Sequence, residues 1–173
     1  ADLYTHNWAE DSKPLYDTWK YLYKVIVFSN DALTTIDKHK QLLTDEQYKA
    51  YRAEVRAIRA LYYYYLMDMF GNIPLVTTAG ESTENADQAS RPEVYRFIVK
   101  ELQEVTPLLP TGHSNLLGKN YGRVTRSVAN FLLAKLMLNG EVYSDADWTD
   151  NQQPNGKQTY FTINGQQMNI WQA

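Results

Sequence analysis

The chain has 173 residues, 44% of them hydrophobic, and a formal net charge of −3 at pH 7. This length and hydrophobic content suit one folded domain and exclude a disordered chain, while the acidic balance argues against nucleic acid or an anionic lipid surface as a partner. Without cysteine the chain cannot hold a disulfide framework, a thiol nucleophile or a cysteine-ligated metal centre, and without an apolar run of about 18 residues or a charged-then-apolar leader we expect neither a membrane span nor an export signal within it.

The first predicted element is a helix over residues 13–38. A polar segment precedes it, and Ser12 followed by Pro14 is typical of a helix start. Beyond Pro14, apolar or small residues recur at alternating steps of four and three, the spacing of an amphipathic helix. They are Leu15, Trp19, Leu22, Ile26, Ser29, Leu33 and Ile36.

The second predicted helix covers residues 45–70 and has two apolar faces. Thr44 and Gln47 have the spacing of a capping box at its start, and Gly71 and Pro74 mark its end. One face carries large side chains, Tyr48, Tyr51, Val55, Ile58, Tyr62, Tyr65 and Met69, and the other carries Ala50, Ala53, Ala57 and Ala60. Two such faces predict two neighbouring helices, one gripped by the bulky residues and one brought close by the alanines.

A charged stripe lies between those two faces and consists of Lys49, Arg52, Arg56 and Arg59. It is either a solvated face paired with acids such as Glu46, Asp68 and Glu101, or a docking surface for an acidic partner. We favour structural pairing, and we expect Arg59 to anchor the packing of the hairpin.

Two further helices are predicted over residues 91–106 and 125–143. Ser90 and Glu93 form a second capping box, Pro107 ends the third helix, and the apolar residues of the fourth go nearly all round it. We therefore expect the fourth helix to be the most buried one and expect no strand before residue 150. The predicted core includes Trp19, Ile58, Tyr62, Ile98, Leu132 and Leu136.

The last part of the chain, residues 144–173, is predicted to be a polar loop that leads into either a hairpin or a truncated helix. Gly165 follows an asparagine, a pair that favours a type I′ turn and a hairpin between residues 158 and 171. In the alternative, residues 166–173 begin a fifth helix with Met168 and Trp171 on one face. In either case, residues 1–143 are predicted to form the TPR-like helical hairpin region of the chain.

Four helices in two successive hairpins predict an all-α fold, a TPR-like right-handed stack of helical hairpins of the α-solenoid kind, although the TPR consensus itself is poorly matched. The run from Glu54 to Leu75, with its four tyrosines and its Phe-Gly-Asn-Ile-Pro turn, resembles the signature helix of the SusD/RagB family. Other segments resemble the family in the same order: Trp19, Tyr23, Ile26, Asn30 and Leu33, then residues 91–110, then Gly122, Arg123, residues 132–136, Val142 and Tyr143. The resemblance covers nearly all of this chain but only part of the longer family members.

The resemblance implies a non-enzymatic role in nutrient uptake. Members of this family are surface lipoproteins of the outer membrane of Bacteroidetes that bind an oligosaccharide or polysaccharide and pass it to a SusC-like TonB-dependent transporter. Their lipidated cysteine is missing from these residues. Their binding loops lie mainly before the first long helix and in the C-terminal half, so the resemblance places most of the binding site outside this segment, which corresponds to the helical scaffold.

Trp8, with Tyr4, His6 and Asn7, is the local candidate for a sugar platform. An aromatic face stacks on a pyranose ring while neighbouring polar groups bind its hydroxyls. In the alternative interpretation, which we favour, Trp8 covers the end of the helical stack. Asp145, Asp147 and Asp150 superficially resemble a calcium loop, but the glycine and the closing glutamate of an EF-hand are missing, so a solvated turn is the better interpretation.

No catalytic motif, cofactor or metal site is predicted, because the sequence contains no assembled nucleophile, zinc or phosphate-binding motif and its three histidines lie far apart. Three hypotheses about function remain. A SusD-like uptake protein predicts glycan binding, a generic helical-repeat interaction module predicts a protein or peptide partner, and a glycosidase predicts turnover of a glycan.

Overall fold

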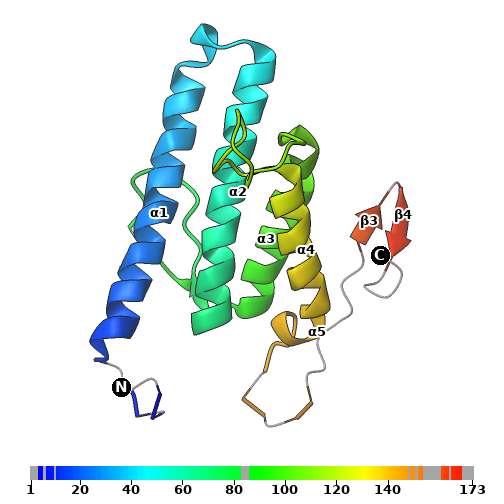
Figure 1. Ribbon diagram of the computed structural model, residues 1–173. Helices are drawn as coiled ribbons and strands as arrows, with labels where there is room; N and C mark the ends of the chain where they lie inside the picture. Colours follow the sequence, from blue (N-terminus) through cyan, green and yellow to red (C-terminus); the bar gives the residue numbers. More distant parts are fainter. Residues whose placement is uncertain are drawn as a thin grey trace.

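The computed structural model describes residues 4–5, 7–9, 11–82, 86–147, 149–150, 152–153, 161–163 and 165–168. Its main body is a stack of α-helices: α1 (Lys13–Lys38), α2 (Asp45–Phe70), α3 (Arg91–Val105) and α4 (Arg126–Leu138), followed by the single turn α5 (Gly140–Tyr143). Figure 1 shows α1 and α2 as a long hairpin, with the shorter α3 and α4 beside it. The predicted all-α, TPR-like fold class is confirmed. None of the helices in the described part of the chain has the length and hydropathy needed to span a membrane.

The helix ends follow from the predicted local signals. Thr44 Oγ1 accepts a hydrogen bond from the Gln47 amide at 3.2 Å, and the Thr44 amide donates to Gln47 Oε1 at 3.0 Å, which completes the capping box of α2. Gly71 ends α2 with φ +73°, a conformation that glycine adopts without the steric cost of a side chain. Because these signals are local, the predicted bounds of α1 and α2 agree with the structure.

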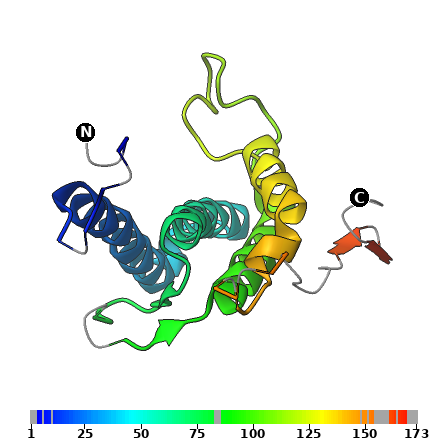
Figure 2. The ribbon, with the colours of Figure 1, turned by 90° about the horizontal axis from the view of Figure 1, so that it is seen from below.

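Helix α2 lies between α1 and α3, as its two apolar faces predict (Figure 2). The closely packed face is the alanine face, on which Ala53, Ala57 and Ala60 are buried. The predicted bulky stripe is covered less well: Tyr65 and Met69 are exposed, and Ile58 is only half-buried. Small side chains allow α3 to approach the α2 backbone closely. Helix α1 covers the bulky stripe only in part, because Tyr48 and Tyr62 contact α1 while Tyr65 and Met69 stay exposed.

Half of the predicted core residues are not fully buried. The predictions for Ile98, Leu132 and Leu136 are confirmed. The predictions for Trp19, Ile58 and Tyr62 are wrong, because each of these side chains is half-buried. Trp19 packs edge-on against Phe70 at the end of the α1–α2 hairpin, and Tyr62 contacts Tyr21 of α1 at the solvent edge with their hydroxyls 3.4 Å apart. Both aromatic residues therefore lie at the border of the core, with water on one side.

Helix α4 is not the most buried helix, which corrects the prediction. Its four buried residues are Ala129, Leu132, Leu133 and Leu136, whereas α3 buries more of its length. Phe131 and Leu138 are 69% and 72% exposed. The predicted helix over residues 125–143 also breaks at Asn139, where α5 begins. Helix α4 packs against α3 and residues 106–108 that follow it, and Phe131 and Leu138 face outward.

A short pair of strands precedes residue 150, so the expectation of no strand there is wrong. Strand β1 (Ile73–Pro74) pairs antiparallel with β2 (Gln88–Ala89). The segment that leaves α2 and the segment that enters α3 therefore run side by side in opposite directions. Where α3 begins, Asn72 Oδ1 accepts a hydrogen bond from the Arg91 amide at 2.8 Å. The pairing spans two residues on each strand and leaves the helical stack unchanged.

Of the two alternatives for the C-terminal segment, a hairpin or a fifth helix, the structure shows the hairpin. Strand β3 (Phe161–Ile163) pairs antiparallel with β4 (Gln166–Met168), and Gly165 has φ +80° in the turn between them. A helix over residues 166–168 is therefore wrong, while Trp171 lies outside the described residues. The division of the chain at residue 143 into two parts stays a prediction.

Candidate functional site

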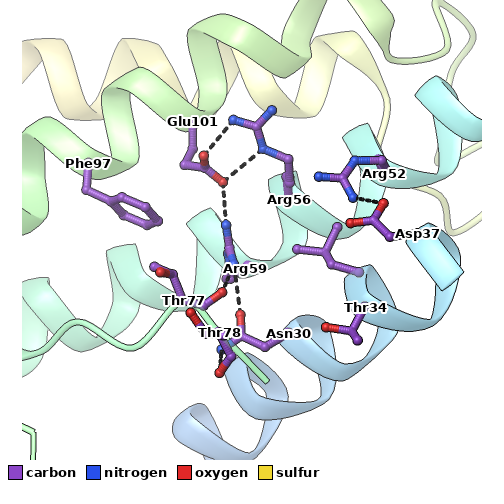
Figure 3. A pocket seen from close by; sticks show the side chains of 11 residues that line it. Asn30, Thr34, Asp37, Arg52, Arg56, Arg59, Thr77, Thr78, Phe97 and Glu101 are labelled. Atoms are coloured by element: carbon purple, nitrogen blue, oxygen red, sulfur yellow. Dashed lines mark hydrogen bonds and ion pairs between the residues drawn. The ribbon is translucent and has the colours of Figure 1, made fainter. Parts of the chain in front are cut away.

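A cleft of about 400 Å³ opens between the helices on the side of the chain that follows β1 (Figure 3). It combines charged, hydroxyl, amide and aromatic side chains from all three of the first long helices. Its lining residues are Asn30, Leu33, Thr34 and Asp37 of α1, Arg52, Arg56 and Arg59 of α2, Thr77 and Thr78 of the chain after β1, and Phe97 and Glu101 of α3.

Arg59 forms the inner wall of the cleft and is only 6% exposed. Its Nη1 donates to Asn30 Oδ1 at 2.8 Å and to the Thr77 carbonyl at 3.0 Å, while its Nη2 donates to Glu101 Oε2 at 2.9 Å. One guanidinium thus joins α1, the chain after β1 and α3 to α2. This confirms the expectation that Arg59 anchors the hairpin and that Glu101 pairs with the charged stripe.

Glu101 is the buried acid that holds two of the arginines. Arg56 donates to both of its carboxylate oxygens, at 3.1 Å from Nε and 2.6 Å from Nη2, and Arg59 supplies the third hydrogen bond. Burial by itself raises the pKa of Glu101, but the hydrogen bonds and charges of Arg56 and Arg59 outweigh it and hold the pKa below its usual value. Glu101 is therefore ionised at neutral pH. Glu104, nearer the surface, accepts from the outer edge of Arg56.

Arg52 closes the outer end of the cleft. It donates from Nη1 to Asp37 Oδ1, which also accepts from the Tyr48 hydroxyl at 2.8 Å. Burial raises the pKa of Asp37, but the hydrogen bonds from Arg52 and Tyr48 and the nearby positive charges together outweigh it and hold the pKa below its usual value. Of the acids expected to pair with the stripe, Asp68 instead accepts a hydrogen bond from Tyr143. The sequence analysis did not identify Asp37 as a partner.

The described residues of the predicted sugar platform, Tyr4, Asn7 and Trp8, are not among those that line this cleft. Tyr4 is 91% exposed and Trp8 is 49% exposed, while Asn7 is exposed and His6 lies outside the described residues. These residues come before α1, and their role in binding stays a prediction.

Sequence reasoning missed several of the lining residues, of which Asn30 carried a usable signal. It is buried on the core side of α1 between Ile26 and Leu33, a position at which a polar side chain needs a partner. Asn30 Nδ2 donates to the Val76 carbonyl at 3.2 Å, so this amide fastens α1 to the chain after β1.

The aspartates after α5 use their carboxylates to cap backbone turns. Asp145 Oδ1 accepts from the Asp147 amide at 3.0 Å, and Asp150 Oδ1 accepts from the Gln152 amide at 2.8 Å. Among the described residues there is no cluster of three groups able to hold a metal ion. The hydrogen bonds place these aspartates in turns, as interpreted, but Asp145 is only 6% exposed, so the expectation that the turn is solvated is wrong at that residue.

Comparison with known protein families shows that most of the chain matches one family. The family model SusD-like, described as starch-binding and associating with the outer membrane, matches residues 1–138. The chain belongs to the SusD-like family. It is 30% identical over 102 residues to the starch-binding protein SusD of Bacteroides thetaiotaomicron, an alignment that covers 59% of this chain and 17% of that protein.

Solved SusD-like structures share the arrangement of helices. A SusD superfamily protein from Parabacteroides distasonis superimposes with a TM-score of 0.70 at 28% identity, covering 83% of this chain and 31% of that one. A SusD-like carbohydrate-binding protein from Bacteroides fragilis gives a TM-score of 0.68 at 25% identity, covering 79% and 27%. The chain thus spans less than a third of the length of these SusD-like relatives.

Proposed function

We propose that this chain is the helical scaffold of a non-enzymatic glycan-binding protein of the outer-membrane surface, which assists oligosaccharide uptake by docking onto a SusC-like TonB-dependent transporter. The observation that carries the proposal is the SusD-like family match over residues 1–138. A solved relative adds to it: a laminarin-binding SusD-like protein superimposes with a TM-score of 0.61 at 28% identity, covering 78% of this chain and 30% of that chain.

The architecture supports a scaffold role. Arg59 and Glu101 tie three helices together through charge-assisted hydrogen bonds, which makes the stack a rigid platform for binding loops carried by other segments. The residues that we expect to contact sugar directly are Trp8, Tyr4, His6 and Asn7. Two of them, Tyr4 and Trp8, have solvent-accessible aromatic side chains.

Calorimetric titration with a panel of plant, host and microbial glycans tests the proposal. We expect residues 1–173 to bind neutral glycans weakly and the polypeptide of the complete reading frame to bind them more tightly. Trp8→Ala should weaken the residual binding, whereas Tyr16→Ala, which removes another exposed aromatic ring, should not. Hydrolysis products in the cell would overturn the non-enzymatic role, and equally tight binding by both polypeptides would place the site on the scaffold.

The transporter partnership needs a separate measurement. A tagged version of the complete polypeptide, expressed in its native host, should co-purify with a TonB-dependent transporter from detergent-solubilised outer membranes. Recovery of the protein only from other cell fractions would contradict both the partnership and the proposed location.

A helical-repeat interaction module is the second candidate, and the uncovered side of the α1–α2 hairpin favours it. Tyr21 and Phe28 lie seven residues apart, and therefore on one face of α1, and are 57% and 59% exposed. Exposed aromatic side chains on one helix face suit contact with another protein element. A peptide or protein partner together with no response to any glycan in the panel would select this candidate.

A further inference from the structure

We propose that the cleft formed by Arg52, Arg56 and Arg59 binds the carboxylate of a uronic acid unit, so that the glycan recognised at this face is an acidic one. This inference rests on the proposed function and names the class of sugar. The cleft is a site separate from the predicted platform at Trp8, because none of its lining residues precedes α1.

The guanidinium groups in the cleft are held in fixed orientations before any ligand arrives. Arg52, Arg56 and Arg59 recur on one face of α2 at steps of four and three, so they line one side of the cleft (Figure 3). Each is fastened by a carboxylate from a neighbouring helix: Asp37 of α1 holds Arg52, and Glu101 of α3 holds the other two. A ligand therefore meets donors whose conformational entropy has already been lost, which favours binding.

These arginines keep hydrogen-bond donors to spare. Arg59 Nε has no partner within the described residues but is buried beneath the surface of the cleft, so the accessible spare donors belong to Arg56 and Arg52. The hydrogen bonds of Arg56 use Nε and Nη2, which leaves Nη1, and that of Arg52 uses Nη1 alone. Arginine carries five N–H donors and no acceptor, so the spare donors bind water in the free protein and can bind the acceptor oxygens of a ligand in its place. A carboxylate offers several in one plane.

The lining itself holds three arginines and two carboxylates, Asp37 and Glu101. Glu104 binds Arg56 from outside the lining, so the charges of the whole cluster balance. The attraction for a carboxylate therefore comes from accessible N–H donors and not from a net positive charge.

The remaining lining suits a sugar ring better than a bare inorganic anion. Thr34 and Thr77 place exposed hydroxyl groups at the rim, and Leu33 and the ring of Phe97 supply apolar surface. A volume of about 400 Å³ lies within the range of small-molecule sites, which spans roughly 300 to 1,000 Å³. That volume accommodates a sugar unit with its carboxylate directed at the arginines.

A nuclear magnetic resonance titration of ¹⁵N-labelled residues 1–173 tests the inference with four probes: trigalacturonate, its neutral counterpart galactotriose, acetate and sulfate. We expect trigalacturonate to shift the amide resonances of the cleft residues and to bind about tenfold more tightly than galactotriose, since a hydrogen bond to a charged group is worth that much. Arg52→Gln should abolish most of this preference. Lys49→Gln removes a positive charge from the same helix outside the cleft and should preserve it.

The outcomes separate this inference from the proposed function. Equal affinity for the charged and neutral trisaccharides, or shifts that acetate and sulfate reproduce at the same concentration, would overturn the recognition of an acidic sugar. If trigalacturonate shifts no amide resonance of the cleft residues while the complete polypeptide binds neutral glycans, the inference fails and the proposed function stands. Failure of every glycan to bind the complete polypeptide overturns the proposed function itself. Circular dichroism verifies that Arg52→Gln is folded, which we expect because the ion pair it removes is partly exposed and contributes little to stability.

Discussion

Replacing Glu101 by glutamine is the sharpest test of how this stack is held together. Glu101 accepts three hydrogen bonds from Arg56 and Arg59, and its side chain is 10% exposed while that of Arg59 is 8% exposed. Glutamine keeps the size of the side chain but removes the charge and one acceptor. The Arg59 guanidinium would then lie buried with no anion beside it.

The size of the effect follows from that burial. Breaking a buried ion pair by removing one partner costs about 3 to 5 kcal/mol, because the remaining charge stays desolvated without compensation. For a chain of this length about 1 kcal/mol lowers Tm by roughly 2 to 4 °C, so Glu101→Gln should lower Tm by about 6 to 20 °C. Glu104→Gln is the matched control. It removes a carboxylate that binds the same Arg56 but is 46% exposed, so its loss should stay below about 1 kcal/mol.

The contribution of Glu101 should also depend on pH. Its folded-state pKa lies below the ordinary value of 4.5 because Arg56 and Arg59 outweigh the opposing effect of burial. A carboxylate with a depressed folded pKa stabilises the protein above its unfolded pKa and loses that contribution as the pH falls through the folded value. The difference in unfolding free energy between the wild type and Glu101→Gln should therefore be constant near neutral pH and shrink below pH 4.5.

Urea unfolding followed by circular dichroism at several pH values measures both effects. The reasoning is refuted if Glu101→Gln destabilises the protein no more than Glu104→Gln, or if the difference between the wild type and Glu101→Gln does not change on acidification. Either result would mean that Arg59 is hydrated and that the network contributes little to the packing of α1, α2 and α3.

Two further substitutions test other parts of the core by the same urea assay. Leu132→Ala should cost about 2 to 5 kcal/mol, because Leu132 is 5% exposed and its removal leaves a cavity between α4 and α2; a loss under about 1 kcal/mol would mean that α4 is peripheral. Tyr63→Phe should cost about 1 to 3 kcal/mol, because the buried Tyr63 hydroxyl donates to the Val76 carbonyl at 2.6 Å and accepts from the Val76 amide at 2.9 Å. Tyr65→Phe, at a side chain that is 42% exposed, should be close to neutral, and equal losses at the two positions would contradict the role of the Tyr63 hydroxyl.

Helix bounds were predictable because they depend on neighbours in the sequence. The capping box of Thr44 and Gln47 and the glycine at position 71 act within a few residues of the helix ends that they define. The strand pair was not predictable on that basis. Ile73 pairs with Ala89 across a connection whose path is set by where α3 docks, and that docking is a tertiary event.

The cleft was predictable only in part, for a related reason. Arg59 could be identified as an anchor, since an arginine beside two apolar faces must find a partner when the helices pack. Asp37 was missed because it belongs to another helix and comes near Arg52 only once α1 and α2 have formed their hairpin. The charged stripe could be predicted from the sequence of α2 alone, whereas its partners depend on how α1, α2 and α3 are placed relative to one another.

The two faces of α2 show why side-chain size alone does not predict burial. Tyr65 and Met69 would each bury more apolar surface than an alanine, yet Ala57 is 2% exposed and Tyr65 is 42% exposed. Small residues let the backbones of α2 and its neighbours approach, so α3 and α4 bury their own large residues, among them Leu102 and Leu132, against the alanine face. Large residues on the opposite side hold neighbours away and become buried only where another element covers them. The periodicity of α2 therefore predicts how many faces it has, and the size of the residues on each face predicts how closely a neighbour can pack there.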